Sequence, residues 1–140
     1  MSLLGRLRSL WSVPRLDGID DERWVVVDVE SSGLDAEHDR LLAIAAVALR
    51  FDARRRPRIE LGDSFEVVLR HDAAGPVDKA NILLHGIGVG AQRAGVDAAV
   101  ALAQWRGWLG RSPLLAYHSA FDQTLIGRAS RALWGRDLPN

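Results

Sequence analysis

The spacing of apolar residues changes part-way along the chain. In the first half, short apolar runs rich in β-branched residues alternate with polar turns and predict three strands, at Trp24–Glu30, Arg40–Phe51 and Ser64–Arg70. The second run is long enough for a helix. However, the short turn before it and the polar loop after it favour a strand paired in a hairpin. The first half is therefore expected to form a three-stranded antiparallel meander.

The second half has helical spacing. Helices are expected at 77–88, 96–110 and 120–135, with a short strand at 113–118 before the last of them. The apolar face of the second helix is expected to contain Val96, Ala99, Val100, Ala103 and Trp108. The face of the last is expected to contain Phe121, Leu125, Ala129 and Leu133. The order of three strands, helix, strand and helix predicts an α/β fold with a mixed sheet.

Length and composition predict one folded domain. The chain has 140 residues, of which 48% are hydrophobic and 26% are charged. Residues 1–20 place Leu3, Leu4, Leu7, Leu10 and Trp11 on one side of a leader helix, and residues 21–140 form the domain. For the leader, docking on its own domain or on a partner is favoured over binding to a membrane surface.

Charge and cysteine content narrow the possible partners. The 18 basic and 18 acidic residues cancel, so affinity for nucleic acid has to come from a local patch or from metal ions. The absence of cysteine fits a reducing compartment, and the expected location is the cytoplasm. No apolar run is long enough to cross a membrane, so no membrane partner is expected.

Two carboxylates lie at the end of the first predicted strand. Asp28 and Glu30 are two residues apart, so they project from the same side of a strand that is otherwise apolar. Such a pair either shares a proton or binds a cation, and Mg²⁺ prefers oxygen ligands of this kind. Acidic pairs are also common on exposed strand edges, so the pair alone does not decide between these interpretations.

Two neighbouring features add to this pattern. Ser31, Ser32 and Gly33 follow at once and offer hydroxyl and backbone N–H groups, although they also suit a plain turn. Asp122 opens the last helix just after a predicted strand, where it could face the same edge of the sheet. An aspartate there also favours the helix dipole.

Three landmarks together resemble a known family. The first, "VVVDVESSGLDAEHDRLLAIAAVAL", is similar to the opening motif of the DnaQ-like (DEDDh) 3′–5′ exonuclease superfamily, which includes the epsilon proofreading subunit of DNA polymerase III. "LLHGIG" resembles its His-Gly-Ile segment, and "LLAYHSAFDQTLI" resembles its second motif. The resemblance extends from Trp24 to Trp134 and implies an RNase H-like fold.

The resemblance also implies roles for individual residues. Asp28, Glu30 and Asp122 would bind two divalent ions, Mg²⁺ or Mn²⁺, for phosphodiester hydrolysis at the 3′ ends of single-stranded DNA or RNA. The residues matched to substrate contacts are Ser31, Ser32, Gly33, Leu34, His85 and Phe121. For His85 alone, a capped core histidine is the favoured interpretation. A DNA polymerase subunit is an expected partner.

The sequence departs from the family pattern in three places. Tyr117 and His118 replace the common His-Asn pair, and Ala43 replaces a frequent glutamate. The third motif, His-x-x-x-x-Asp, is absent, since only Asp137 and no histidine follows Asp122. The domain is therefore expected to be incomplete at its C-terminus. His38 lies in a turn, and His71 and Asp72 are expected to be a solvated loop pair.

Three functions remain open from the sequence. The first is a metal-dependent 3′–5′ exonuclease. The second is a catalytically impaired exonuclease-fold module that docks a polymerase or another partner. The third is an ordinary α/β domain with an accidental acidic pair. No residue distinguishes a DNA substrate from an RNA substrate, since that choice depends on how the site treats a 2′-hydroxyl group.

Overall fold

The computed structural model describes residues 22–72 and 79–136 of the chain. The predicted leader helix at 1–20 and Asp137 lie outside the described residues. Within the described part, no helix is both long enough and apolar enough to cross a membrane.

A four-stranded mixed sheet forms the centre of the fold. Its strand order is β3-β2-β1-β4, with antiparallel pairing of β1 with β2 and of β2 with β3, and parallel pairing of β1 with β4. The strands are β1 (Arg23–Ser31), β2 (Leu41–Phe51), β3 (Pro57–Val68) and β4 (Leu114–Leu115). The predicted meander and mixed sheet are confirmed, but β3 begins at Pro57 instead of Ser64.

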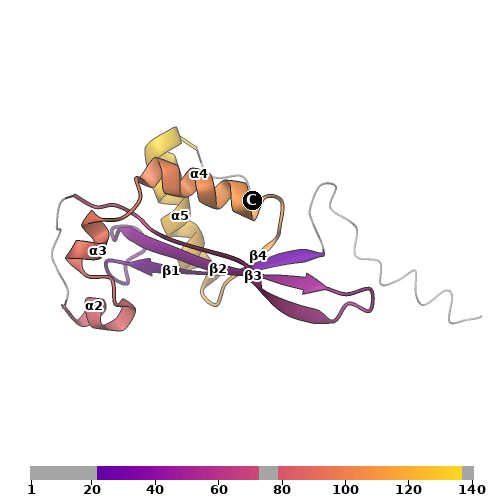
Figure 1. Ribbon diagram of the computed structural model, residues 1–140. Helices are drawn as coiled ribbons and strands as arrows, with labels where there is room; N and C mark the ends of the chain where they lie inside the picture. The colour runs from indigo at the N-terminus through magenta and orange to yellow at the C-terminus, as the bar shows by residue number, and fades with distance from the viewer. Residues whose placement is uncertain (1–21, 73–78, 137–140) are drawn as a thin grey trace, which may run out of the picture.

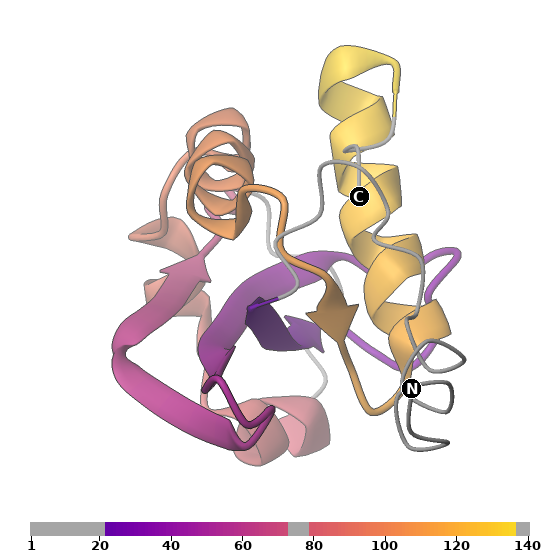
Figure 2. The same ribbon diagram turned by 90° about the vertical axis from the view of Figure 1, so that its right-hand side faces the viewer.

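Four helices surround the sheet in the described residues. They are α2 (Lys79–His85), α3 (Val89–Arg93), α4 (Ala98–Leu109) and α5 (Ser119–Trp134). In Figures 1 and 2, α4 and α5 lie together on one side of the sheet, whereas α2 and α3 lie near the end of the sheet where β1 finishes. The short α3 was not predicted, because five residues are too few to establish a helical period.

The predicted apolar face of α4 is correct only in part, because Val96 and Trp108 pack against the core whereas Val100 and Ala103 are exposed. Val96 precedes the helix and forms a parallel β-bridge with Leu69. Asp97 is the N-cap of the helix, and its side chain accepts hydrogen bonds from two backbone N–H groups of the first turn. The helix therefore begins at Ala98, with Ala103 exposed and Val100 49% exposed. Its buried residues are Ala101, Leu102, Trp105 and Leu109.

Two smaller expectations also differ from the structure. Leu133 is 42% exposed, so the apolar face predicted for α5 does not extend to the last turn of the helix. His71 is half-buried, and its Nε2 lies 2.8 Å from the Leu41 carbonyl oxygen. It therefore connects the end of β3 to the start of β2 instead of being a freely solvated loop residue.

The core lies between one face of the sheet and the helices α4 and α5. Val25, Val27 and Val29 of β1 are all buried in it, while Asp28 on the other face is exposed. Opposite the end of β1, β2 contains an extra residue, because Glu30 pairs with Ala43 but Ser31 pairs with Leu41. This bulge breaks the alternation of β2 and explains why the four consecutive residues 41–44 are buried.

Arg23 joins the beginning of β1 to β3 and α4. Its guanidinium group donates to both carboxylate oxygens of Asp63, at 2.8 and 2.9 Å, and to the Ser112 Oγ at 2.7 Å. The same group lies 4.6 Å from the ring centre of Trp108. These contacts hold the pKa of the Asp63 carboxyl group at about 2, chiefly through the hydrogen bonds from Arg23.

We expect Asp63→Asn to destabilise the fold at pH 7 by about 1–2 kcal/mol, because it removes a charge that Arg23 binds in the folded state. A pKa lowered from 3.8 to about 2 contributes stability above about pH 4, which is lost as the pH falls through 2. Urea unfolding should therefore show a difference from wild type at pH 7 that shrinks at pH 2.5. An equal difference at both pH values would contradict this, and Asp72→Asn is the exposed control.

Candidate active site

The two carboxylates of β1 lie on the side of the strand that faces away from the valines. Asp28 is exposed and Glu30 is half-buried, and both lie near the end of β1, where the partner strand bulges. The predicted placement on one face is confirmed by this burial pattern. Because the opposite face packs into the core, the strand keeps both carboxylates on the face that points away from it.

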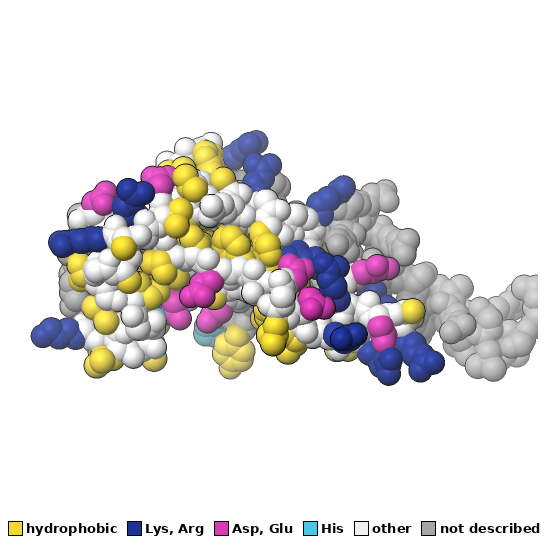
Figure 3. All heavy atoms as spheres, viewed as in Figure 1, with side chains coloured by type: hydrophobic (Ala, Val, Ile, Leu, Met, Phe, Trp, Pro, Cys, Tyr) yellow, Lys and Arg dark blue, Asp and Glu magenta, His cyan; other side chains and the backbone are white. Residues whose placement is uncertain are grey.

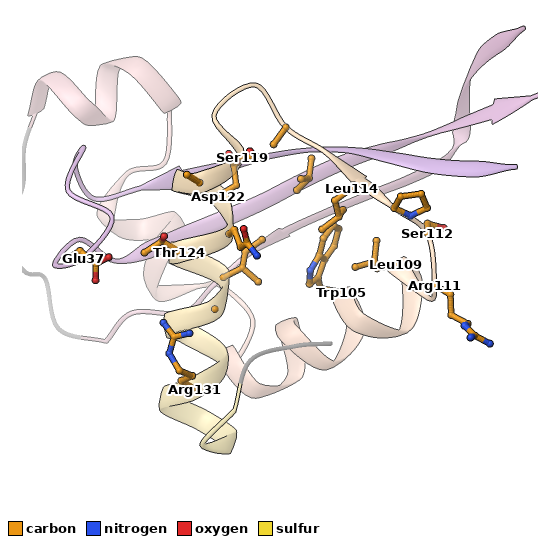
Figure 4. Close-up of a pocket in the computed structure, with 17 residues that line it drawn as sticks. Glu37, Trp105, Leu109, Arg111, Ser112, Leu114, Ser119, Asp122, Thr124 and Arg131 are labelled. Carbon is orange, nitrogen blue, oxygen red and sulfur yellow. The ribbon is translucent and has the colours of Figure 1, made fainter. Parts of the chain in front are cut away.

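Asp122 reaches the same end of β1 from the first turn of α5. It is only 5% exposed, and the backbone N–H of Val29 is among the hydrogen-bond donors that lower the pKa of its carboxyl group. Figure 4 shows Asp122 on the wall of a cleft of about 700 Å³ that is also lined by Trp105 and Leu109 of α4. The helix therefore positions this carboxylate between the strand edge and the cleft.

The negative charge of Asp28 affects both of the other carboxyl groups. The pKa of Glu30 is raised first by burial and then by Asp28, with an opposing effect from His85. The pKa of Asp122 is likewise raised first by burial, and Asp28 contributes to the increase. Carboxylates from two remote parts of the sequence thus lie within electrostatic reach of Asp28. Acidic side chains can be seen among hydrophobic ones on the face shown in Figure 3.

The turn after β1 is held by its own polar groups. The Ser31 Oγ donates to the Gly33 carbonyl oxygen, and the Ser32 Oγ donates to the Asp39 carboxylate at 2.8 Å. A Cβ atom at Gly33 would lie 2.4 Å from an oxygen of that carboxylate, so the position has no room for a side chain. The same carboxylate accepts from the backbone N–H of Asp35 at 2.9 Å.

The remaining predicted substrate residues differ in their surroundings. Leu34 is 87% exposed, so its side chain is available to a ligand. His85 ends α2 as a half-buried residue, its Nδ1 accepts from the Ile87 N–H at 2.9 Å, and its charge acts on Glu30. Phe121 is half-buried and packs against the core, so only part of its ring can meet a ligand.

Two positioning residues were not identified from the sequence. The Arg128 Nη1 donates to the carbonyl oxygens of Ala36 and Asp39, at 2.6 and 2.8 Å, and so fastens α5 to the turn after β1. The Asn81 Nδ2 donates to the Ser31 carbonyl oxygen at 2.7 Å and fastens α2 to the end of β1. Their partners are distant in sequence and belong to the backbone, so no sequence pattern marks these contacts.

The donor atoms at this site suit a hard divalent cation. Carboxylate oxygens are the ligands that Mg²⁺ and Mn²⁺ prefer. Burial is the main cause of the raised pKa values of Glu30 and Asp122, and the added repulsion from Asp28 would be relieved by a cation. Within residues 22–72 and 79–136, no group of three or more acidic or histidine side chains is already arranged around an ion position.

A family model described as RNase_T exonuclease matches residues 25–140. The chain belongs to this RNase T/DnaQ-like exonuclease family. The exonuclease domain is 30% identical over 111 residues to the PolC-type DNA polymerase III of Listeria innocua, a match that covers 79% of the chain. It is 28% identical over 115 residues to the Bacillus subtilis enzyme of the same name, a match that covers 82%. In both cases the match spans only 7% of the length of the relative.

Solved structures support the fold of the exonuclease domain. Escherichia coli Exonuclease I in complex with a dT13 oligonucleotide matches with a TM-score of 0.62 over 78% of this chain and 23% of the other, at 18% identity. The product-bound structure of exonuclease I matches with a TM-score of 0.63. The predicted family resemblance and fold class are therefore confirmed.

We expect Asp28→Asn to raise the melting temperature of the metal-free exonuclease domain at pH 7 by about 2 °C, because it removes a charge that repels both Glu30 and Asp122. Raised carboxyl pKa values reduce stability as the pH rises through them, so the gain should be smaller at pH 4. Thermal unfolding in EDTA at both pH values measures this. Glu60→Gln on β3 is the exposed control, and an unchanged or lower melting temperature for Asp28→Asn would contradict the repulsion.

We expect Arg128→Met to loosen the connection between α5 and the turn at residues 32–39. The loss of two hydrogen bonds from a charged donor should lower the free energy of unfolding by about 2 kcal/mol. Hydrogen exchange of the Asp39 amide, which donates to the Asp35 carbonyl oxygen within the turn, should become faster. Arg106→Met on the exposed side of α4 should not change this amide. Equal exchange in wild type and Arg128→Met would argue against the role of Arg128.

Proposed function

We propose that this domain hydrolyses the terminal phosphodiester bond at the 3′ end of single-stranded nucleic acid and releases nucleoside 5′-monophosphates. The proposal rests on family membership together with one observation. The charge of Asp28 acts on Glu30 from the same strand and on Asp122 from a helix more than 90 residues further along the chain. A site that gathers like charges in this way suits a cationic cofactor.

In this proposal, Asp28, Glu30 and Asp122 bind two divalent ions, Mg²⁺ or Mn²⁺. When bound, such ions lower the pKa of water and stabilise the attacking and departing oxygens of a phosphoryl transfer. The carboxylates would supply the oxygen ligands, with Asp122 doing so from a largely buried position in the first turn of α5. The Val29 N–H holds the same group against the end of β1.

The turn after β1 and the end of α2 would hold the terminal nucleotide. Ser31 is only 7% exposed and donates to the Gly33 carbonyl oxygen, so it would support the turn more than touch the substrate. The Ser32 Oγ donates to Asp39 and accepts from the Arg40 N–H, which leaves it one acceptor position for a ligand. The backbone of Gly33 and the exposed side chain of Leu34 offer a surface for the sugar. His85 and the exposed part of Phe121 would border the same nucleotide. Contacts of this kind depend little on base identity.

The 140-residue chain has no histidine after Asp122 that could act as the general base of the family pattern. Loss of a general base commonly lowers a rate by about 10²- to 10⁴-fold. We therefore expect slow hydrolysis by this polypeptide when it is assayed alone. The assay consequently needs high enzyme concentrations and a sensitive readout of mononucleotides.

The test is the release of nucleoside 5′-monophosphates from single-stranded DNA and RNA oligonucleotides in Mn²⁺ or Mg²⁺. We expect release from the 3′ end, loss of release in EDTA, and a fall of at least about 100-fold in Asp122→Asn and Asp28→Asn because each removes a ligand. Glu60→Gln, an acidic substitution on the exposed part of β3, is the matched control and should retain the wild-type rate.

Release that survives in both ligand variants would point to a contaminating nuclease and would end the proposal. Oligonucleotide binding without any release would favour the alternative of a catalytically impaired module that docks a polymerase. The PolC-type relatives carry the matched region within a polymerase chain, which makes a polymerase the partner to test first. Comparing the DNA and RNA rates then assigns the substrate class.

A further inference from the structure

Tyr117 is a large aromatic residue whose full exposure is not explained by packing within the fold. It follows β4 in the loop that leads into α5, and it is 99% exposed. Its ring is stacked on His118, with 5.5 Å between ring centres and an interplanar angle of 22°. A side chain this exposed adds almost nothing to the buried area of the domain. The offset contact with His118 sets the two rings nearly parallel and leaves almost the whole of the Tyr117 ring open to solvent.

His118 also departs from what its position favours. It is the N-cap of α5, where Ser, Thr, Asp or Asn would accept a hydrogen bond from the first turn, yet its side chain makes no capping bond. Its imidazole ring is instead paired with Tyr117. Helix α5 therefore lacks a side-chain cap, and His118 forms an exposed pair of rings with Tyr117. Such exceptions to local preference are expected at functional positions.

The aromatic pair is adjacent to the proposed catalytic carboxylate. The His118 carbonyl oxygen accepts from the Phe121 N–H at 2.8 Å and from the Asp122 N–H at 3.3 Å. Burial raises the pKa of Asp122, and a small opposing effect from His118 shows that the imidazole lies within electrostatic reach of that carboxyl group. A ligand that reaches Asp122 with its terminal phosphodiester can therefore bring a neighbouring base close to Tyr117.

We propose that the Tyr117–His118 pair is a stacking platform for one nucleobase of a single-stranded 3′ end. This rests on the proposed function, because it assigns a base-binding position to that same site. The exposed ring of Tyr117 offers a flat, amphipathic surface, and the His118 ring lies nearly parallel beside it. Stacking accepts any base, as removal of successive nucleotides requires.

The chain provides a direct spectroscopic probe, because Tyr117 is its only tyrosine. Growth on 3-fluorotyrosine gives a protein whose single ¹⁹F resonance reports on this ring. The titrants are a thymidine oligonucleotide with phosphorothioate linkages, which resist hydrolysis, and the same backbone with abasic sites at its last three positions. We expect the ¹⁹F resonance to move with the thymidine oligonucleotide and to stay in place with the abasic one.

Affinity measurements with variants complete the test. Tyr117→Ala should weaken binding of the thymidine oligonucleotide by about 10-fold, whereas Tyr117→Phe should stay within about 2-fold of wild type, because stacking needs the ring and not the hydroxyl group. Leu61→Ala is the matched control, since it removes a 79% exposed apolar side chain from β3. It should leave both the affinity and the ¹⁹F resonance unchanged.

The outcomes separate this inference from the proposed function. An equal ¹⁹F shift with the abasic oligonucleotide, or unchanged affinity in Tyr117→Ala, would overturn the stacking platform even if the domain hydrolyses DNA. A thymidine-specific shift in a domain that releases no nucleotide would keep the platform and remove the nuclease. No binding of either oligonucleotide would overturn both.

Discussion

The two-residue period of β1 is the constraint on which the rest of the structure depends. Its valines anchor one face of the strand in the core, and this fixes the opposite face as the position of Asp28 and Glu30. A slip by one residue would carry both carboxylates together onto the core face and would expose the valines. Hydrophobic packing therefore maintains an electrostatically unfavourable arrangement that the strand would not adopt for its own sake.

Three separate contacts build the candidate site around this strand. Arg128 ties α5 to the turn after β1, Asn81 ties α2 to the end of β1, and the Val29 N–H holds Asp122. At the opposite end of the sheet, Arg23 closes β1 onto β3 and α4. The sheet is thus joined to α4 near the start of β1, whereas the acidic side chains of the candidate site gather near the end of β1.

The sequence predicted those parts of the fold whose period is regular. The strand that contains Asp28 and the helix that contains Asp122 could be recognised, because the apolar spacing and the turn residues beside each one predict the same element. The face of α4 could not, because Val96 pairs with Leu69 and Gly95 lies so close to the Leu69 backbone that a Cβ atom there would be 2.7 Å from it. This contact between distant segments places the start of α4 at Ala98 and so changes which of its residues are buried.

For the site, the spacing of Asp28 and Glu30 predicted their shared face, and the ordered landmarks predicted the family. Burial, which is the largest cause of the raised pKa values of Glu30 and Asp122, could not be obtained from spacing because it depends on packing between elements. The bridging role of Arg128 was hidden for a related reason. Its acceptors are backbone carbonyls, and these carry no side-chain signal in a sequence.

The crowding at Gly33 has a consequence for the history of such domains. The Asp39 carboxylate fills the space where a side chain at residue 33 would begin, so a larger residue there would push that carboxylate away from the Ser32 hydroxyl and the Asp35 N–H. The glycine of the Ser-Ser-Gly turn therefore serves the hydrogen bonds of the turn, whether or not the domain hydrolyses a substrate. Persistence of that signature marks ancestry, and the carboxylates are the better record of whether the chemistry has been retained.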